Sequence, residues 1–368
     1  MSSKIFTIFG KIEDNRRVLS NDYDLNTILV SAMISVISGA NSWNEIEEYC
    51  IEKADWLSTF LNLKNGIPSH DTYNRVISGI KPEKLESCFR EWVETLILDK
   101  GLQGVINLDG KTIRGAKKHG VKSAFHMVSA WSCNSNMVLG QLRVNEKSNE
   151  ITAIPKLIDL LDIENCIITI DAIGCQTDIV DKIIEKKADY VLAVKGNQSK
   201  LFEEIQDEFR FTKATDFNET IDLDHGRIET RKCSVITNFQ HFENQNKWKN
   251  LKSIIRIESI REFKNSDKEK ETNTRYYISS IIKNATFFQE TIRSHWSIEN
   301  KLHWTLDVAF SEDMSRKRVK NAAENFSLIT KIGLNILKND TSTKMEVKGK
   351  RLKAGWSNKY LEKLLGIN

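Results

Sequence analysis

Apolar positions in the first part of the chain recur at the three- and four-residue spacing of amphipathic helices. Residues 25–38 predict a strongly apolar helix, and Ser42 is placed to cap the helix that follows. Ser69 can cap a third helix, and Pro82 opens a fourth. The pattern predicts a separate, all-helical N-terminal domain over residues 1–98.

The third of these helices follows a short turn and carries His70 and Arg75. Two helices joined by a tight turn form the unit with which many proteins read the major groove of DNA. Most small helical bundles have no such role. A DNA-binding unit and an accessory domain therefore both remain open for this segment.

From Gly104 onward the pattern changes to short buried strands. Strands are predicted over residues 105–109, 124–132, 137–144, 166–171 and 190–194, with a helix before the fourth and another before the fifth. This order, β-β-β-α-β-α-β, favours one mixed sheet flanked by helices, which is an α/β fold. In such a sheet the first and fourth strands can lie side by side.

Residues 212–286 interrupt this alternation with polar segments and strand-like runs. The runs are ETRKCSVIT, LKSIIRIESIRE and RYYISSII. We interpret the stretch as a β-rich insertion in a second domain over residues 99–340. A last helix over residues 319–337 is expected to close that domain, leaving residues 341–368 as a basic C-terminal tail.

Residues 293–310 predict a helix that is rich in acid, imidazole and indole groups. His295, Glu299 and His303 recur every fourth residue, which is expected to place them on one face. Trp296 and Trp304 lie beside that face, although single tryptophans pack more often than they stack on bases. The histidines also suggest a zinc hydrolase, but their spacing differs from the HExxH motif.

Two upstream carboxylates could complete a site with this helix. Asp109 and Asp171 each follow an apolar strand, where an ionised group is costly unless it is exposed or bound. Each alone is more readily a turn or capping residue. Three convergent carboxylates, however, suit divalent metal ions and phosphoryl transfer on DNA. We therefore predict that Asp109, Asp171 and Glu299 are the catalytic residues and hold Mg²⁺, for which Mn²⁺ would substitute.

Basic and polar side chains near these acids are candidates for contact with DNA. Lys111 and Arg114 follow Asp109 in a loop bounded by glycines, and Lys195 and Asn197 follow the fifth strand. Other DNA-binding candidates are Arg227, Arg231, Arg293, His295, Trp296, Asn300, Lys301 and His303. Each could instead be ordinary solvated charge, and their shared position near the acids favours the DNA hypothesis.

Composition restricts the remaining classes of protein. The chain has 54 Lys or Arg against 50 Asp or Glu, so its net charge of +4 is only mildly basic. The segment after residue 340 contains seven Lys or Arg and two acids. Such a basic segment is typical either of a solvated chain end or of contact with nucleic acid. The six cysteines form no CxxC pair, and no apolar run is long enough to span a bilayer. We expect a cytoplasmic protein without a membrane partner.

Several segments together resemble insertion-sequence DDE transposases of the H-repeat-associated (Rhs-linked) family. They are SWNEIEEYC, NGIPSHDTYNRV, LDGKTIRG, VNEKSNEITAIPKLIDLLD, TIDAIGCQ, ADYVLAVKGNQ, YYISSI, HWSIENKLHWTLDVAFSED and KAGW. The resemblance covers nearly the whole chain, and the set is specific although no single segment is. It implies a ribonuclease-H-like core interrupted by a β-rich insertion. It also implies a bacterial, nucleoid-associated location.

The resemblance further implies Mg²⁺-dependent cleavage at the ends of an element and strand transfer into target DNA. Its catalytic triad maps onto Asp109, Asp171 and Glu299. The partners would be double-stranded DNA, as terminal inverted repeats and target, and a second copy in a homodimer. Related transposases carry Tyr-x2-Arg-x3-Glu-x6-Lys around the third acid, but here Ile292, His295 and Leu306 replace the other three residues. A decayed relic that binds DNA without cutting, and a nuclease without strand transfer, are the alternatives.

Overall fold

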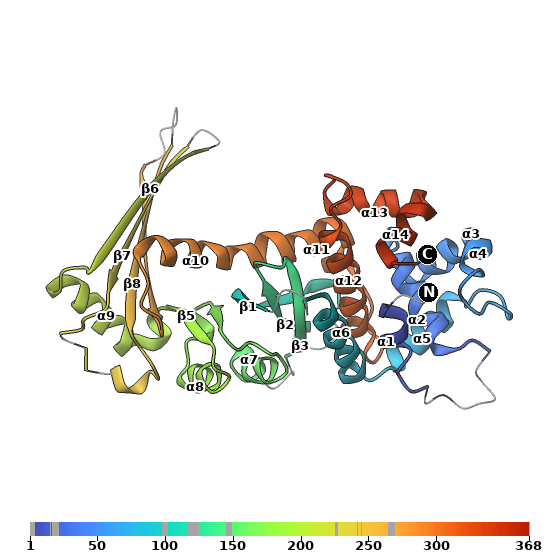
Figure 1. Cartoon of the computed structure of the whole chain (residues 1–368), viewed down its shortest axis with the longest axis horizontal. Helices are drawn as coiled ribbons and strands as arrows, with labels where there is room; N and C mark the ends of the chain where they lie inside the picture. The colour runs from blue at the N-terminus through green and yellow to red at the C-terminus, as the bar shows by residue number, and fades with distance from the viewer. Residues whose placement is uncertain are drawn as a thin grey trace.

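The molecule is built around a single long sheet with helices on both sides and at one end (Figure 1). The computed structural model describes residues 4–14, 16, 22–97, 102–116, 125–144, 149–224, 227–240, 242–243, 245–263 and 269–367. In this part of the chain the sheet has nine strands in the order β3-β2-β1-β4-β5-β9-β8-β7-β6. The prediction of a mixed α/β fold is confirmed.

The strands are β1 Gly104–Ile113, β2 Phe125–Ser132, β3 Met137–Arg143, β4 Cys166–Ile170, β5 Asp189–Val194, β6 Asp216–Asp224, β7 Arg227–Ile236, β8 Ser253–Phe263 and β9 Glu271–Ser279. The α-helices are α1 Lys4–Phe9, α2 Leu25–Ile37, α3 Trp43–Glu52, α4 Ala54–Leu57, α5 His70–Gly79, α6 Pro82–Ile97, α7 Glu150–Asp159, α8 Thr177–Glu185, α9 Ser199–Phe211, α10 Ala285–Ser297, α11 Trp304–Phe310, α12 Ala322–Asn339, α13 Val347–Trp356 and α14 Asn358–Leu365. Within the described ranges, none of these helices has the length and apolar character that crossing a membrane requires.

The first and fourth strands are neighbours, as the strand order predicts. β1 pairs in parallel with β4 up to Leu108 and Ile170, and β4 pairs in parallel with β5. β1 is longer than predicted, because its antiparallel pairing with β2 continues from Asp109 to Ile113. The glycine-bounded segment that was expected to be a loop is therefore strand as far as Ile113.

Helices cover both faces of the central strands. α7 and α8 lie on one face, and α10, a π-helical turn η6 (Ile298–His303) and α11 cross the other face as one long rod (Figure 1). Asn284 caps the start of α10 by accepting a hydrogen bond from the backbone N–H of Phe287 at 2.9 Å. The rod carries Glu299 over the strands that carry Asp109 and Asp171.

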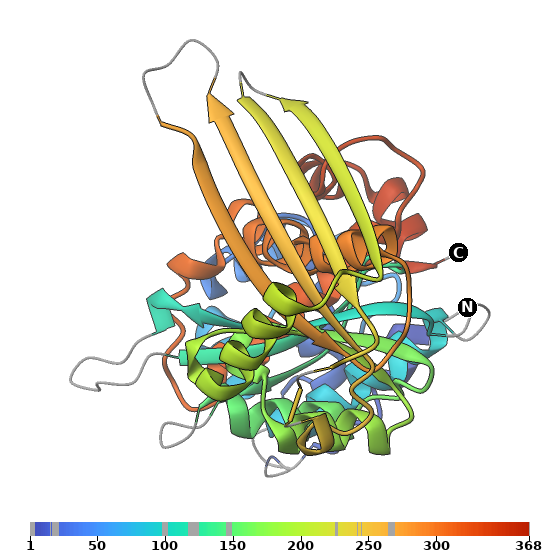
Figure 2. The ribbon, with the colours of Figure 1, turned by 90° about the vertical axis from the view of Figure 1, so that its left-hand side faces the viewer.

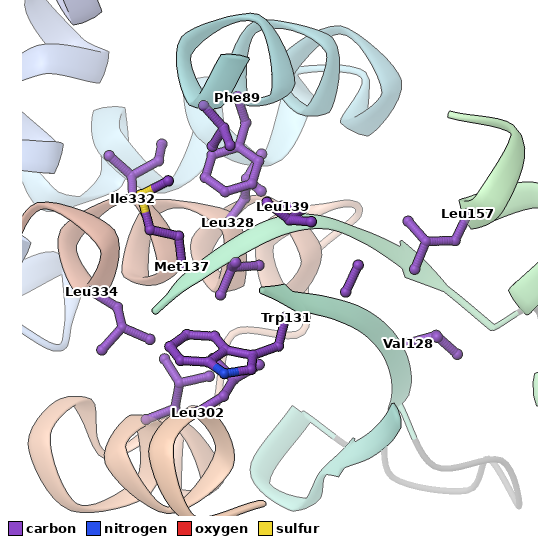
Figure 3. Packing of buried hydrophobic residues seen from close by; sticks show 14 of the residues in the cluster. Phe89, Val128, Trp131, Met137, Leu139, Leu157, Leu302, Leu328, Ile332 and Leu334 are labelled. Carbon is purple, nitrogen blue, oxygen red and sulfur yellow. The ribbon is translucent and has the colours of Figure 1, made fainter. Parts of the chain in front are cut away.

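The N-terminal helices share a hydrophobic core with the end of the sheet. Ser42 and Ser69 cap α3 and α5 as predicted, through the backbone N–H groups of Glu45 and Thr72. Figure 3 shows Phe89 of α6 packed beside Leu139 of β3 and Ile332 of α12. The domain boundary predicted at residues 98–99 lies outside the described residues and stays a prediction.

The strand-like runs of residues 212–286 form β7, β8 and β9, and β6 precedes them. β9 pairs with β5, so these strands lengthen the central sheet rather than forming a separate one. They project beyond α10 at one side of the molecule (Figure 1). β6 was missed because its alternation is masked by Asp216, Glu219 and Asp222, which are unusual strand residues.

The basic C-terminal stretch is folded, in contrast to the predicted tail. It forms α13 and α14, whose Ala354 and Leu361 are fully buried. The Arg351 guanidinium is buried and donates to the backbone oxygens of Val36, Ala40 and Ala309. This segment therefore fastens the end of the chain to the N-terminal helices, and part of its positive charge is internal.

Candidate active site

Asp109 and Asp171 lie at the same level of two adjacent parallel strands. The last paired residues of these strands are Leu108 and Ile170, and each is followed directly by an acid. Neighbouring strands are about 4.8 Å apart, which brings the two carboxylates into one patch. The prediction that these strand positions meet is confirmed, while the catalytic role of the acids stays a prediction.

Asp109 is held by a histidine from the helical rod. The Nε2–H of His303 donates to Oδ2 of Asp109 at 3.1 Å, and the His303 side chain is only 12% exposed. His303 Nδ1 is buried and has no hydrogen-bond partner among the described residues. One carboxylate oxygen of Asp109 is thus fixed by the protein, and the other oxygen stays available for a ligand.

A second hydrogen-bonded chain fixes the rod to the strands beneath it. The hydroxyl of Thr169 donates to Oδ1 of Asn107 at 2.7 Å, so His295 must donate its Nδ1–H to Thr169 Oγ1 at 2.8 Å. The amide of Asn107 donates to the backbone oxygen of Ser294 at 2.7 Å. Burial lowers the pKa of His295, which keeps the imidazole neutral. His295 was expected to contact DNA. In the structure its imidazole instead joins the helical rod to β4 through Thr169.

Asp171 begins the turn after β4, where Oδ1 accepts a hydrogen bond from the backbone N–H of Ile173 at 3.1 Å. Its pKa is raised, first by burial and then by the charges of Glu150 and Asp109. Crowded carboxylates repel one another, so a bound cation would stabilise all of them together.

Glu150 is an acid of this site that the sequence reasoning did not assign. Its Oε1 lies 2.5 Å from Nε2 of His126, whose Nδ1 lies 2.9 Å from the hydroxyl of Thr112. A Cβ on Gly110 would come within 2.3 Å of the same Glu150 oxygen, so only glycine lets the carboxylate approach β1 this closely. In the sequence Glu150 is recognisable only as an acid in the first turn of a helix, where acids usually stabilise the helix dipole.

Glu299 differs from the two histidines, whose imidazoles hydrogen-bond to Thr169 and Asp109 of the strands beneath the rod. Its side chain is exposed, and its carboxylate forms no hydrogen bond or ion pair with any residue that the structure describes. The predicted common face assumed a regular α-helix, whereas residues 298–303 form a π-helical turn. A π turn contains more residues than an α turn, so it rotates the side chains that follow out of register. Such turns are frequent at functional sites.

Lys111 does not face solvent, although it was expected to contact DNA. Its side chain is 12% exposed, and its ammonium lies 2.5 Å from Asp307 and 3.0 Å from Glu312. Burial alone would lower the pKa of Lys111, but Glu312 and Asp307 outweigh it and raise that pKa. Lys111 therefore joins β1 to α11 and to the short helix η7 (Glu312–Met314).

Other candidates for DNA contact stay accessible near the acids. Lys195 and Asn197 are exposed, and Asn197 donates to the backbone oxygen of Ala172 at 2.7 Å, next to Asp171. Arg114 is exposed and lies 3.5 Å from Asp313. The strand order thus places Lys195 and Asn197 at the edge that carries the two acids, whereas Arg114 lies past the end of β1, beyond Ile113.

The remaining candidates gather in a groove between the projecting sheet and the rod. The groove has a volume of about 560 Å³ and is lined by six Lys or Arg against two Glu. The cations are Arg227, Arg231, Arg261, Arg275, Arg293 and Lys301, with Trp296 and Asn300 beside them. The guanidinium of Arg275 lies over the Trp296 ring, 5.0 Å from its centroid. Arg261 and Arg275 were not predicted, because their separation in sequence from the acids hid this proximity.

The donor set partly fits a divalent metal ion. Asp109 and Asp171 supply the hard carboxylate oxygens that Mg²⁺ and Mn²⁺ prefer. In the described ranges, however, no three His, Cys, Asp or Glu side chains are close enough together to hold an ion. The same finding gives no support to a zinc site made by His295, Glu299 and His303.

Two family models match this chain. The DDE_Tnp_1-associated domain matches residues 6–93, and the transposase DDE domain matches residues 100–336. The chain belongs to the DDE transposase family. Members of the DDE family generally use divalent metal ions, which agrees with the carboxylate patch at Asp109 and Asp171.

Relatives at high identity place the chain among the H-repeat-associated DDE transposases. It is 43% identical to "Putative transposase YncI" of Escherichia coli O157:H7, over 96% of this chain and 92% of that protein. It is 40% identical to "H repeat-associated putative transposase YhhI" of E. coli strain K12, over 98% and 97% of the two chains. A solved piggyBac transposase synaptic complex with hairpin DNA superposes with a TM-score of 0.46 and 9% identity, over 98% of this chain and 80% of that one.

Proposed function

We propose that this DDE transposase cleaves DNA at the ends of an insertion element and transfers the freed strand into target DNA. The observation that carries the proposal is the register of β1 and β4, which sets Asp109 and Asp171 side by side. A ribonuclease-H-like core accounts for this register, because β3-β2-β1-β4-β5 is an antiparallel meander followed by two parallel strands.

Asp109 and Asp171 would hold the metal ions, and Glu299 would complete the set. Metal bound there would act as a Lewis acid on the scissile phosphate and would lower the pKa of the attacking water. Mg²⁺ is the ion we propose, with Mn²⁺ able to replace it. His303 orients Asp109 by its hydrogen bond to Oδ2, so the free oxygen of that carboxylate points to one position.

Glu299 is proposed as the third ligand because it lies about one helical turn before His303, whose imidazole contacts Asp109. The buried hydrogen bonds of Asn107 and Thr169 hold the rod before this turn, and the hydrogen bond from His303 to Asp109 holds its last residue. DNA entering the groove would contact Asn300 and Lys301 on this same turn.

Double-stranded DNA is the proposed partner, and the arginine-lined groove is its proposed path to the acids. Guanidinium groups pair with phosphate oxygens, and the groove begins on the rod within one turn of Glu299. Arg114, Lys195 and Asn197 would contact the strand on the other side of the acids. No DNA contact is proposed for the N-terminal helices.

The decisive test of function is product mapping on DNA that carries the natural flanks of this gene. Purified protein with Mg²⁺ is expected to cut at the element ends, leave 3′-hydroxyl groups and join them to a second DNA. Cuts without joined products would identify a nuclease. Binding without cuts would identify a relic, and either result would contradict the proposal.

Removing the groove arginines is expected to weaken DNA binding and its salt dependence together. In the double variant Arg261→Ala and Arg275→Ala, two phosphate contacts are lost, so the slope of log affinity against log salt should fall by about 1 for each. Fluorescence anisotropy at several salt concentrations measures this slope. Arg210→Ala is the control, because Arg210 is exposed on α9 and pairs with Asp207. An unchanged slope in the double variant would exclude the groove as the DNA path.

A further inference from the structure

The two faces of β1 meet different parts of the molecule. Asp109 points to the helical rod, where it contacts His303. Side chains alternate along a strand, so Gly110 and Thr112 are on opposite sides of the sheet from Asp109 and from each other's neighbours in the strand. Figures 1 and 2 show the rod above the central strands and α7 and α8 below them. The face of β1 that carries Gly110 therefore meets the start of α7.

On that face His126 and Glu150 form a hydrogen-bonded pair. The Nε2–H of His126 donates to Oε1 of Glu150 at 2.5 Å, and Nδ1 of the same ring lies 2.9 Å from the hydroxyl of Thr112. The side chains of His126 and Glu150 are only 24% and 17% exposed. The imidazole is thus fixed at both of its nitrogens, and it keeps the Glu150 carboxylate from turning out to solvent.

Glu150 lies close to both aspartates of the candidate active site. Its carboxylate occupies the space left because Gly110, the residue after Asp109, has no side chain. Its helix, α7, also packs against η3 (Ala172–Gly174), the turn that begins at Asp171. Burial raises the pKa of Asp171, and the charge of Glu150 raises it further. The negative charge of Glu150 therefore acts at the place where a cation would bind.

A purely structural role does not account for a charge at this position. The neutral amide of a glutamine could accept the same hydrogen bond from His126. A carboxylate beside Asp109 and Asp171 instead adds like charge to a partly buried patch, which destabilises the free protein. The same charge becomes favourable once a divalent cation is bound, because each nearby negative charge then attracts that cation.

We propose that Glu150, held in place by His126, is a positioning residue whose charge strengthens the binding of a divalent cation by Asp109 and Asp171. Glu150 acts across space and does not touch the ion, because in the described ranges no three His, Cys, Asp or Glu side chains are close enough together to share one. The inference rests on the proposed function, in which the two aspartates hold that ion. It adds to that function a residue from the face of the sheet opposite the rod.

Binding of Mn²⁺ to the full chain without DNA tests the inference, and the electron paramagnetic resonance signal of the unbound ion measures it. Glu150→Gln keeps an acceptor for His126 and removes the charge, so the affinity for Mn²⁺ should fall by on the order of tenfold. Glu150→Asp keeps the charge but is one methylene shorter, so it should bind Mn²⁺ more tightly than Glu150→Gln does. Glu185→Gln is the control, because Glu185 is an exposed acid on α8, and it should bind as wild type does.

The order of the two Glu150 variants separates the effect of charge from that of the hydrogen bond. Circular dichroism first establishes that each variant is folded. Affinities that fall in the order wild type, Glu150→Asp and Glu150→Gln would support the inference. A Glu150→Gln protein with wild-type affinity would show that Glu150 only joins α7 to the sheet, and would overturn the inference. A wild-type protein that binds no Mn²⁺ before DNA is added would overturn it as well.

Asp171→Asn, measured in the same experiment, distinguishes this inference from the proposed function. If Asp171→Asn loses Mn²⁺ while Glu150→Gln retains it, the proposed site stands and the role of Glu150 is wrong. If Asp171→Asn binds Mn²⁺ as tightly as wild type does, the ion does not lie at Asp171. That result would contradict the proposed site, and the inference with it.

Discussion

Replacing Asp109 or Asp171 with asparagine should reduce DNA cleavage by on the order of 10³-fold or more. Asparagine preserves the shape of the side chain but removes the negative charge that a divalent cation needs. Both acids lie in the one patch formed where β1 and β4 stop pairing. Folding should be retained, because removing one charge relieves the repulsion between the crowded carboxylates.

Cleavage rates and DNA affinity are measured for the same preparations. Asp178→Asn is the matched control, because Asp178 is an exposed acid in the first turn of α8, close to Asp171 in sequence. It should cut at the wild-type rate. Cleavage by Asp109→Asn or Asp171→Asn at near wild-type rates would rule out the site. Loss of DNA binding together with cleavage would point to misfolding instead.

Replacing Lys331 with alanine should lower the free energy of unfolding by about 3–5 kcal/mol. The Lys331 ammonium is buried, donates to Oε1 of Gln141 at 2.5 Å and lies 3.3 Å from the hydroxyl of Ser327. That hydroxyl donates to Glu312 at 3.0 Å, and Glu312 also accepts from Lys111. Burial would raise the pKa of Glu312, but Lys331 and Lys111 outweigh it and lower that pKa.

Lys331→Ala would therefore leave Glu312 buried with less compensating charge, which is why the loss should be large. Urea unfolding followed by circular dichroism measures it. Lys156→Ala, at an exposed position of α7, should change stability by less than about 0.5 kcal/mol. The neutral pair Lys331→Met with Glu312→Gln should recover part of the loss. A change below about 1 kcal/mol for Lys331→Ala would show that this buried network is not important for stability.

The sequence predicted the parts of this molecule that depend on local pattern. Ser42 and Ser69 cap their helices, and the apolar runs before Asp109 and Asp171 are neighbouring strands. Strand order followed from the alternation of strands and helices, since few arrangements of such a chain are possible. The meeting of the two aspartates was therefore predictable without a structure.

Features decided by tertiary contacts were not predictable in this way. The extension of β1 to Ile113 depends on β2, and the polar Lys111 inside it is stabilised by acids from α11 and η7. The C-terminal helices were hidden because Lys350 and Arg351 are buried through hydrogen bonds to backbone oxygens. Charge pattern alone cannot distinguish such residues from a solvated tail.

The site shows the same division. Glu299 was expected on a regular α-helix, but the part of the rod that carries it forms a π turn, which has no reliable sequence signal. Glu150 was not assigned because an acid at the start of a helix is common. It is distinguished by its close approach to Gly110, where a Cβ atom would collide with its carboxylate. Arg261 and Arg275 reach the groove through strand pairing over a long sequence separation.

Metal rescue tests most directly the central claim that Asp109 and Asp171 hold the catalytic ion. In Asp171→Cys a thiolate replaces a carboxylate, and thiolate is a poor ligand for Mg²⁺ and a more acceptable one for Mn²⁺. Cleavage at the element ends is measured for wild type, Asp171→Cys and Asp171→Ala in each metal. The account predicts that Asp171→Cys is inactive with Mg²⁺ and regains cleavage with Mn²⁺, whereas Asp171→Ala is inactive with both. Wild-type cleavage by Asp171→Cys in Mg²⁺ would contradict it.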